Sequence, residues 1–240
     1  MVLTSYSLFY ALKKEKSEII PVYTAGHSLG EFSALTVSES IDPVDAVWIT
    51  NIRGELMQEA VPEGKGAMAA IIGLKAEEIE EILKDIDGVV EIANYNSYEQ
   101  TVISGETPAV EKAMEILKEK GAKKVVKLAV SVPAHSSLLK EKANEFAQYI
   151  DKLNIDDAKI PVISNITAEP ISKSNEIREE LKQHFYSPVR WVQTVEFLKS
   201  QGVDTIFEIG PKKVLAGLIK RIDRGFNIIN IQTLEDIKNL

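Results

Sequence analysis

The stretch of sequence that decides the fold is IIPVYTAGHSLG, residues 19–30. Its first part, Ile19–Ala25, is an apolar run without alternation, which is typical of a short strand buried on both faces of a parallel sheet. A Gly-x-Ser-x-Gly pattern centred on Ser28 follows, and Glu31–Val37 predicts a helix. Strand, glycine-flanked serine and helix in this order predict a sharp turn that exposes Ser28 at a helix N-terminus.

A serine in such a turn is suited to nucleophilic catalysis. Its hydroxyl is a weak nucleophile and must be lifted clear of its neighbours and deprotonated during attack. The backbone N–H of the next residue, Leu29, points to where an oxyanion would form, and the helix dipole adds to its effect. We therefore predict that Ser28 carries acyl groups on its own hydroxyl, with Leu29 as an oxyanion donor. A glycine-rich turn without chemistry is the alternative, and the flanking strand and helix weigh against it.

The chain contains three histidines that could act as the general base. His27 adjoins Ser28 and should leave the turn in another direction, so we interpret it as a packed support for the turn. His135 lies at a strand-to-helix junction, and loops of this kind line clefts between domains. His184 lies near the end of a charged helix, where a solvated or capping histidine is common. These positions favour His135 as the base, and because no acidic partner is marked, a Ser–His dyad oriented by a backbone carbonyl is a further alternative.

Arg53 lies on the helix predicted to begin at Asp42-Pro43, with Met57 one turn later on the same face. An arginine near a nucleophile can hold a substrate carboxylate with two parallel hydrogen bonds. Without further context, a surface arginine paired with Glu55 is the simpler interpretation.

Composition and charge exclude several classes of function. Apolar residues make up 45% of the chain and charged residues 27%, the usual profile of a globular protein. The net charge is −8, from 28 basic and 36 acidic residues, so the overall field would repel nucleic acid and anionic lipid. The sequence has no cysteine, which excludes disulfides, thiolate metal sites and a cysteine nucleophile. We find no secretory signal and no apolar run of the roughly 18–20 residues that a membrane span needs. We therefore expect a cytoplasmic protein with no metal and no nucleic-acid or membrane partner.

The order of predicted elements indicates two structural parts. Residues 64–132 predict strands and helices in the order βαββαβ, a compact ferredoxin-like unit. The flanking segments alternate strands and helices, which is typical of a parallel sheet flanked by helices. We therefore expect an α/β fold with a discontinuous core, residues 1–63 and 133–240, interrupted by a ferredoxin-like subdomain at residues 64–132.

A set of short motifs, spread over nearly the whole chain, identifies a family when its members are considered together. They are GHSLGE (residues 26–31), RGELMQ (53–58), GAMAA (66–70), NYNS (94–97), VPAH (132–135), SPVRW (187–191), and Gly210-Pro211 before Leu215 and Gly217-Leu218. In this order they closely resemble the malonyl-CoA:acyl carrier protein transacylases of bacterial fatty acid synthesis. The resemblance implies a hydrolase-like α/β domain interrupted by a ferredoxin-like subdomain. It also implies transfer of a malonyl group from malonyl-CoA to the phosphopantetheine thiol of acyl carrier protein, without a cofactor.

The resemblance also implies roles for individual residues. Ser28 would be the acylated nucleophile, His135 its base, and Arg53 the group that grips the free malonyl carboxylate. A backbone carbonyl at the position of His184 would orient the base, although the usual side chain there is glutamine. The remaining residues with implied roles are Leu29 as an oxyanion donor, and Met57, Asn96 and His27 as substrate-binding residues.

Four basic residues match positions that the family offers to its carrier protein: Lys123, Lys124, Lys220 and Arg221. A carrier protein is acidic, so a local basic patch is enough to bind it despite the negative net charge. Solvated lysines at the edge of a subdomain are the alternative for each of them.

The start of the chain departs from the family pattern. Family members begin with a strand that ends in a Gly-Gln-Gly-Ser-Gln-like loop, whose glutamine supplies the second oxyanion amide. No such motif precedes the first predicted helix, Thr4–Lys16. Loss of one oxyanion donor typically lowers turnover by roughly 10²–10³-fold, so we expect impaired activity from a chain without that loop. A fragment of a longer product, a misassigned start and a form completed by a partner chain are the alternatives.

Two other functions stay open on the sequence. A polyketide-type acyltransferase or a thioesterase would share the acyl-serine, but the motif at residues 132–135 favours malonyl over branched extenders, and Arg53 has no use in a simple hydrolase. A truncated carrier-binding protein with little or no turnover is the alternative from another class, and the missing first strand is its main support.

Overall fold

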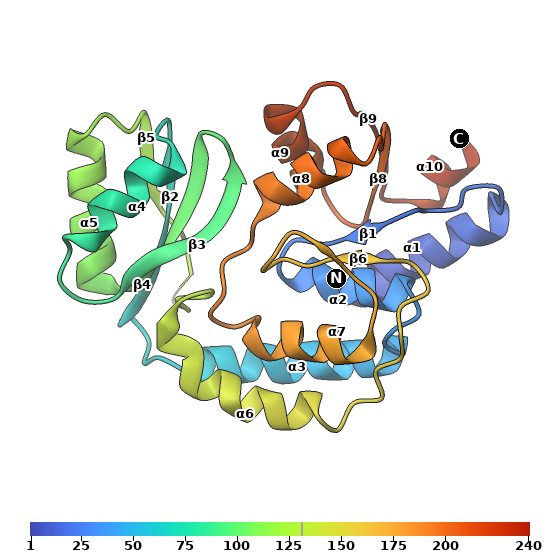
Figure 1. Ribbon diagram of the computed structural model, residues 1–240, viewed down its shortest axis with the longest axis horizontal. Helices are drawn as coiled ribbons and strands as arrows, with labels where there is room; N and C mark the ends of the chain where they lie inside the picture. Colours follow the sequence, from blue (N-terminus) through green and yellow to red (C-terminus); the bar gives the residue numbers. More distant parts are fainter. Residues whose placement is uncertain (131) are drawn as a thin grey trace. The chain divides into compact units, whose positions relative to one another are not determined.

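The computed structural model describes residues 1–130 and 132–240 and shows a mixed α/β fold (Figure 1). The chain divides into two compact units. Unit 1 comprises Met1–Thr50, Leu153–Arg178 and Gln193–Leu240, and unit 2 comprises Asn51–Lys152 and Glu179–Val192. The expected subdomain at residues 64–132 lies within unit 2, apart from residue 131, which is outside the described residues. Unit 2 is larger than that subdomain because it also takes in segments on both sides of it and a short later segment.

Three of the four chain boundaries between the units fall inside helices, and the fourth lies between Lys152 and Leu153. The three helices are α3 (Pro43–Glu59), α7 (Ser174–Gln183) and α8 (Trp191–Ser200). Each of them therefore contributes residues to both units, and the units are described separately below.

Unit 1 contains the strand that leads into the Ser28 turn. Strand β1 (Thr24–Ala25) pairs in parallel with β6 (Val162–Ile163), and β6 pairs in antiparallel fashion with β7 (Pro170–Ile171). The strand at β1 is shorter than the expected run from residue 19 to 25. Ile20 and Val22 are 79% and 64% exposed, so the expectation of a strand buried on both faces is wrong for that part of the run.

A second parallel pair completes unit 1. Strands β8 (Thr205–Ile209) and β9 (Asn227–Ile231) pair along their full length, and α9 (Val214–Ile222) connects them. The Glu208 carboxylate of β8 accepts hydrogen bonds from the first turn of α9, at Leu215 N (2.8 Å) and Ala216 N (2.9 Å). This carboxylate satisfies two amides that the helix itself leaves unpaired.

Helices α1 (Val2–Glu15), α2 (Leu29–Val37) and α10 (Leu234–Lys238) also belong to unit 1. Three elements of this unit were not predicted from the sequence: β7, β9 and α10.

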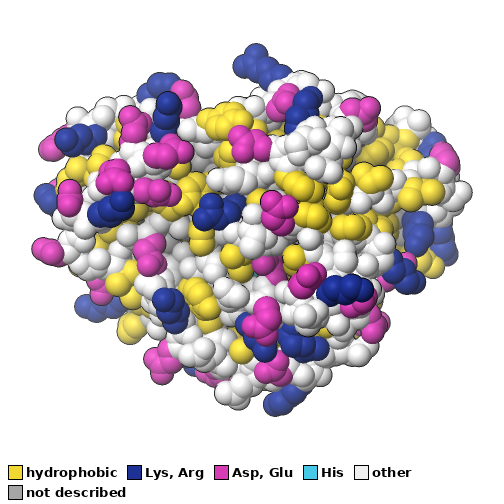
Figure 2. Space-filling model, viewed as in Figure 1, with side chains coloured by type: hydrophobic (Ala, Val, Ile, Leu, Met, Phe, Trp, Pro, Cys, Tyr) yellow, Lys and Arg dark blue, Asp and Glu magenta, His cyan; other side chains and the backbone are white. Residues whose placement is uncertain are grey.

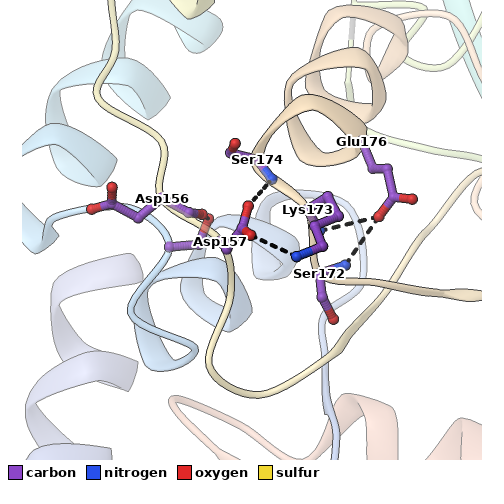
Figure 3. A network of polar contacts seen from close by, with 7 residues as sticks. Asp156, Asp157, Ser172, Lys173, Ser174 and Glu176 are labelled. Atoms are coloured by element: carbon purple, nitrogen blue, oxygen red, sulfur yellow. Dashed lines mark hydrogen bonds and ion pairs between the residues drawn. The ribbon is translucent and has the colours of Figure 1, made fainter.

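The start of α7 is held by a polar network in unit 1 (Figure 3). Asp157 accepts hydrogen bonds from the Ser174 amide at 2.8 Å and from Lys173 Nζ at 2.8 Å. Glu176 Oε2 accepts from the amides of Ser172 (3.3 Å) and Lys173 (3.1 Å). Two carboxylates thus take up backbone donors at the beginning of this helix.

Unit 2 is built on a four-stranded antiparallel sheet with the strand order β3-β4-β2-β5. The strands are β2 (Gly66–Ile72), β3 (Val90–Ser97), β4 (Gln100–Glu106) and β5 (Lys124–Lys127), and the helices between them are α4 (Ala76–Lys84) and α5 (Thr107–Glu119). The predicted βαββαβ order of elements is confirmed. Alternate residues of β2 face α4 and α5, where Ala67, Ala69 and Ile71 join a buried apolar core. Met68 faces the other way and contributes to a smaller cluster with Ala93.

The segment after α7 is attached to this sheet. Val189 pairs with β3 through two backbone hydrogen bonds, Tyr95 N to Val189 O and Val189 N to Ala93 O, both 2.9 Å. Phe185 packs against Phe146 of α6 (Lys140–Ile150), with 4.7 Å between ring centroids, and a short 3₁₀ helix at Ser137–Leu139 precedes α6. These contacts fix the backbone on both sides of residues 186–188.

Acidic and basic side chains are interspersed over the face seen in Figure 2. No helix in the described part of the chain is both long and apolar enough to span a membrane. Within the same residues, no group of three or more His, Cys, Asp or Glu side chains is arranged to hold a metal ion.

Candidate active site

Ser28 occupies a strained turn between β1 and α2. Its backbone has φ 50° and ψ −114°, a conformation that costs an ordinary residue free energy and that clusters at functional sites. A Cβ on Gly26 would lie 2.0 Å from the carbonyl carbon and oxygen of Gly30, so only glycine fits there. A Cβ on Gly30 would meet no atom of the described residues within 4 Å. The first glycine of the pattern is therefore required by close packing, whereas the second is not.

Asn165, which follows strand β6, forms hydrogen bonds that hold this turn. Its side-chain Oδ1 accepts a hydrogen bond from Ser28 N at 2.8 Å, and its Nδ2 donates to the carbonyl of Gly26 at 2.6 Å. The backbone amide of Asn165 donates to Glu31 Oε1 at 3.2 Å, and both residues are buried. The parallel register of β1 and β6 places Asn165, two residues beyond β6, beside the turn that follows β1.

The sequence analysis missed Asn165 and Glu31. One signal was present, because the carboxyl ends of adjacent parallel strands lie at the same edge of a sheet. A polar residue at the carboxyl end of the short apolar run Ile160–Ile163 was therefore a candidate neighbour of Ser28.

His135 lies in unit 2 and is 4% exposed. Its backbone φ is 60°, so both residues predicted to form the catalytic pair have a positive φ. The Nδ1 atom lies 2.9 Å from the carbonyl oxygen of Ser187, and the His135 amide donates to Phe185 O at 2.8 Å. A carbonyl can only accept, so Nδ1 carries the proton of the neutral ring and Nε2 is the basic nitrogen.

The carbonyl that orients His135 belongs to Ser187, and the role expected for the His184 backbone is corrected accordingly. The reason is the path of the chain after α7. The amide of His184 still donates to Leu181 O, as in a final helical turn, and Ser187 N donates to Gln183 O. The chain then turns and pairs with β3 at Val189. This path brings the carbonyl of Ser187, three residues after His184, to the imidazole of His135.

Arg53 is buried, so the interpretation as a surface arginine is wrong. Its Nε donates to Nδ1 of His184 at 3.3 Å, while Glu55 accepts a hydrogen bond from Asn51 at 2.7 Å. The His184 ring is 1% exposed and lies 5.7 Å from the His135 ring, centroid to centroid. Unit 2 thus brings an arginine and two histidines into one buried cluster.

The other predicted site residues divide between the units. Met57 on α3 and Asn96 on β3 are buried in unit 2. His27 and Leu29 are half-buried in unit 1, and Leu29 is the first residue of α2, where the helix leaves the amide unpaired.

The four basic residues predicted to bind a carrier are exposed. Lys123 forms an ion pair with Glu99 (3.0 Å), and Lys124 is the first residue of β5, both in unit 2. Lys220 and Arg221 are in the last turn of α9, in unit 1. Each pair is therefore available to solvent on its own unit.

Comparison with known proteins identifies the family. Residues 18–231 match the acyl transferase domain family. The malonyl CoA-acyl carrier protein transacylase of Bacillus subtilis is 43% identical over 229 residues, which cover 94% of this chain and 72% of the relative. The solved structure of the Coxiella burnetii malonyl CoA-acyl carrier protein transacylase is 42% identical with a TM-score of 0.96, covering 99% of this chain and 76% of that chain. A malonyl-transacylase solved in complex with a type II PKS acyl-carrier protein is 40% identical with a TM-score of 0.95, covering 99% of this chain and 77% of that chain. The chain therefore belongs to the malonyl CoA-acyl carrier protein transacylase family.

Proposed function

We propose that this chain transfers a malonyl group from malonyl-CoA to the phosphopantetheine thiol of acyl carrier protein through a malonyl-Ser28 intermediate. The observation that carries the proposal is the strained turn at Ser28, held by Asn165 and closed by Gly26, in a chain of this family. A backbone strained at one serine and supported by buried groups is the arrangement expected of an activated nucleophile.

In the first half-reaction the Ser28 hydroxyl attacks the thioester carbon of malonyl-CoA, and His135 Nε2 accepts the hydroxyl proton. The Leu29 amide stabilises the oxyanion of the tetrahedral intermediate. The carbon–sulfur bond then breaks, and the CoA sulfur leaves with the proton from His135. The contact between His135 Nδ1 and Ser187 supports this role, since it leaves Nε2 as the basic nitrogen.

The second half-reaction reverses these steps with another thiol. The carrier's phosphopantetheine thiol gives its proton to His135 and attacks the malonyl-serine ester. The ester bond to Ser28 breaks, and the serine oxygen recovers a proton from His135. No oxidant, reductant or cofactor is needed, because one acyl group moves between two thiols.

Arg53 is proposed to select the malonyl group by binding its free carboxylate, with Met57 and Asn96 beside the acyl chain. A buried arginine that loses its anionic partner is costly, so an acetyl group would be bound less well. This selection favours malonyl transfer over the thioesterase alternative, in which such an arginine has no use.

The fold is proposed to be a hydrolase-like core, residues 1–63 and 133–240, interrupted by a ferredoxin-like subdomain at residues 64–132. The strand order β3-β4-β2-β5 and the βαββαβ sequence of elements support the subdomain. The parallel pairs β1–β6 and β8–β9 support the core.

The exposed basic pairs, Lys123 with Lys124 and Lys220 with Arg221, are proposed to bind the acidic carrier protein. A malonyl-transacylase similar to this chain has been solved with an acyl-carrier protein bound, which supports such a partner.

Intact-mass measurement after exposure to malonyl-CoA tests the proposal. The wild-type chain should gain one malonyl group, and the Ser28→Ala variant should gain none. Addition of holo carrier protein should then return the chain to its original mass and move the malonyl group to the carrier. A chain that binds the carrier yet never gains the malonyl mass would instead be a carrier-binding protein without turnover.

A further inference from the structure

The side chain of His184 lies against the arginine proposed to select the substrate. Nε of Arg53 donates to Nδ1 of His184 at 3.3 Å, and the two side chains are 8% and 1% exposed. Arginine stays protonated and can only donate, so Nδ1 is the acceptor and the neutral ring carries its proton on Nε2. Both residues belong to unit 2, on α3 and on the turn that follows α7.

His184 occupies the Nε edge of the Arg53 guanidinium, and this limits how a substrate carboxylate can bind to Arg53. A guanidinium offers two forks to a carboxylate, the end-on pair of Nη groups and the side-on pair of Nε with one Nη. The contact with Nδ1 engages Nε, which closes the side-on fork. A substrate carboxylate then has to meet Arg53 end-on.

The backbone around His184 is well placed to hold its ring still. The Phe185 ring packs on Phe146, with 4.7 Å between centroids, and Val189 is tied to β3 by two hydrogen bonds of 2.9 Å. A buried imidazole on a segment fixed at both sides loses little entropy when it accepts a hydrogen bond.

We propose that His184 is a positioning residue for substrate selection, which holds the Arg53 guanidinium in the orientation that takes a carboxylate end-on. It acts through Arg53 and does not touch the acyl group. The proposal rests on the function proposed above, since it assigns the orientation of the group that distinguishes malonyl from acetyl.

Two substitutions distinguish the effect of the Nδ1 acceptor of His184 from the effect of its side-chain volume. His184→Asn keeps an acceptor, because Oδ1 of asparagine lies as many bonds from the backbone as Nδ1 of histidine. His184→Leu keeps apolar volume and removes the acceptor. The readout is the ratio of kcat/KM for malonyl transfer to that for acetyl transfer, measured from the two CoA thioesters to the same carrier. We expect His184→Leu to lower this ratio roughly 10- to 100-fold, the range for a lost hydrogen bond to a charged group, and His184→Asn to stay within about threefold of wild type.

A double-mutant comparison tests whether the effect passes through Arg53. In an Arg53→Ala background, His184→Leu should lower the ratio no further. Leu181→Ala is the matched control, because it removes buried volume from α7. It should lower the melting temperature and leave the ratio unchanged. If His184→Leu does not fold, His184→Phe replaces it as a ring without an acceptor.

Three results would overturn the inference. They are an unchanged ratio in His184→Leu, an equal loss in His184→Asn, and a further loss from His184→Leu in the Arg53→Ala background. A wild-type chain that is never acylated by malonyl-CoA would overturn the proposed function instead, so the two failures are distinguishable.

Discussion

Asn165 Oδ1 accepts a hydrogen bond from the backbone amide of Ser28 at 2.8 Å. Nδ2 of the same Asn165 side chain donates to the Gly26 carbonyl at 2.6 Å, so one buried side chain binds the backbone at both Gly26 and Ser28. The strained φ of Ser28 persists because the surrounding structure holds it, and Asn165 is the principal holder that the structure shows.

Asn165→Ala should therefore slow acylation and destabilise the fold together. The change leaves the Ser28 amide and the Gly26 carbonyl without this partner, at a cost of about 1–3 kcal/mol for each buried group. Stopped-flow acylation by malonyl-CoA and thermal unfolding measure the two effects. Asn154→Ala is the control, since Asn154 is exposed and its side chain donates a hydrogen bond to the exposed Asp156 at 3.3 Å. Equal acylation rates in the two variants would contradict the role of Asn165.

The two glycines of the nucleophile pattern should differ sharply on substitution. Gly26→Ala places a Cβ 2.0 Å from Gly30 backbone atoms, so we expect loss of folded protein or of acylation. Gly30→Ala meets no described atom within 4 Å and lies in α2, where alanine favours the helix by about 1 kcal/mol. Melting temperatures should fall for the first variant and be kept or raised for the second. A large loss of stability in Gly30→Ala would contradict the difference in packing.

Arg53→Ala should lower the preference for malonyl over acetyl more than it lowers the rate of acetyl transfer. The malonyl carboxylate loses charge-assisted hydrogen bonds that acetyl never makes, so the malonyl-to-acetyl ratio of kcat/KM should fall by roughly 10- to 100-fold. Arg53→Lys should give an intermediate ratio, because an ammonium keeps the charge and lacks the fork. An unchanged ratio in both variants would remove Arg53 from substrate selection.

Stability should fall with acid partly through Asp157. Its pKa is held below the ordinary value of an aspartate, chiefly by the hydrogen bond from Lys173 and next by the Ser174 amide (Figure 3). A carboxyl with a lowered pKa in the folded state contributes stability that is fully present above its ordinary pKa and is lost as the pH falls through the folded value. The difference in unfolding free energy between wild type and Asp157→Asn should therefore be constant near neutral pH and shrink below about pH 4.

Urea denaturation at a series of pH values measures this difference. A difference that grows with acid would contradict the sign argued for Asp157.

Charge reversal at the end of α9 should weaken the second half-reaction alone. Lys220→Glu with Arg221→Glu should raise KM for carrier protein, and the increase should diminish at high salt, because exposed charges steer association and are screened. Acylation of Ser28 by malonyl-CoA should be unaffected. Lys84→Glu, at an exposed lysine on α4, is the control and should leave both half-reactions unchanged.

Local features of the site were determined by the sequence itself. The Ser28 turn follows from neighbours within a few residues, since Gly26 is needed for the close approach and the helix begins at Leu29. The order of strands and helices in residues 64–132 was also predictable, because side-chain periodicity distinguishes a helix from a strand without reference to distant segments. Outside that segment β7, β9 and α10 were missed, and the strand expected at residues 19–25 was confined to Thr24–Ala25.

Only the tertiary structure determined the contacts and the burial that depend on segments far apart in the chain. Asn165 reaches Ser28 across 137 residues because β1 and β6 pair in parallel, and no local pattern marks that register. The chain path after α7 gave the orienting carbonyl to Ser187, and the burial of Arg53 beside His184 reversed the simpler interpretation of a surface charge. Short-range sterics and periodicity are written in consecutive residues, whereas burial and hydrogen-bond partners arise only when distant segments pack together.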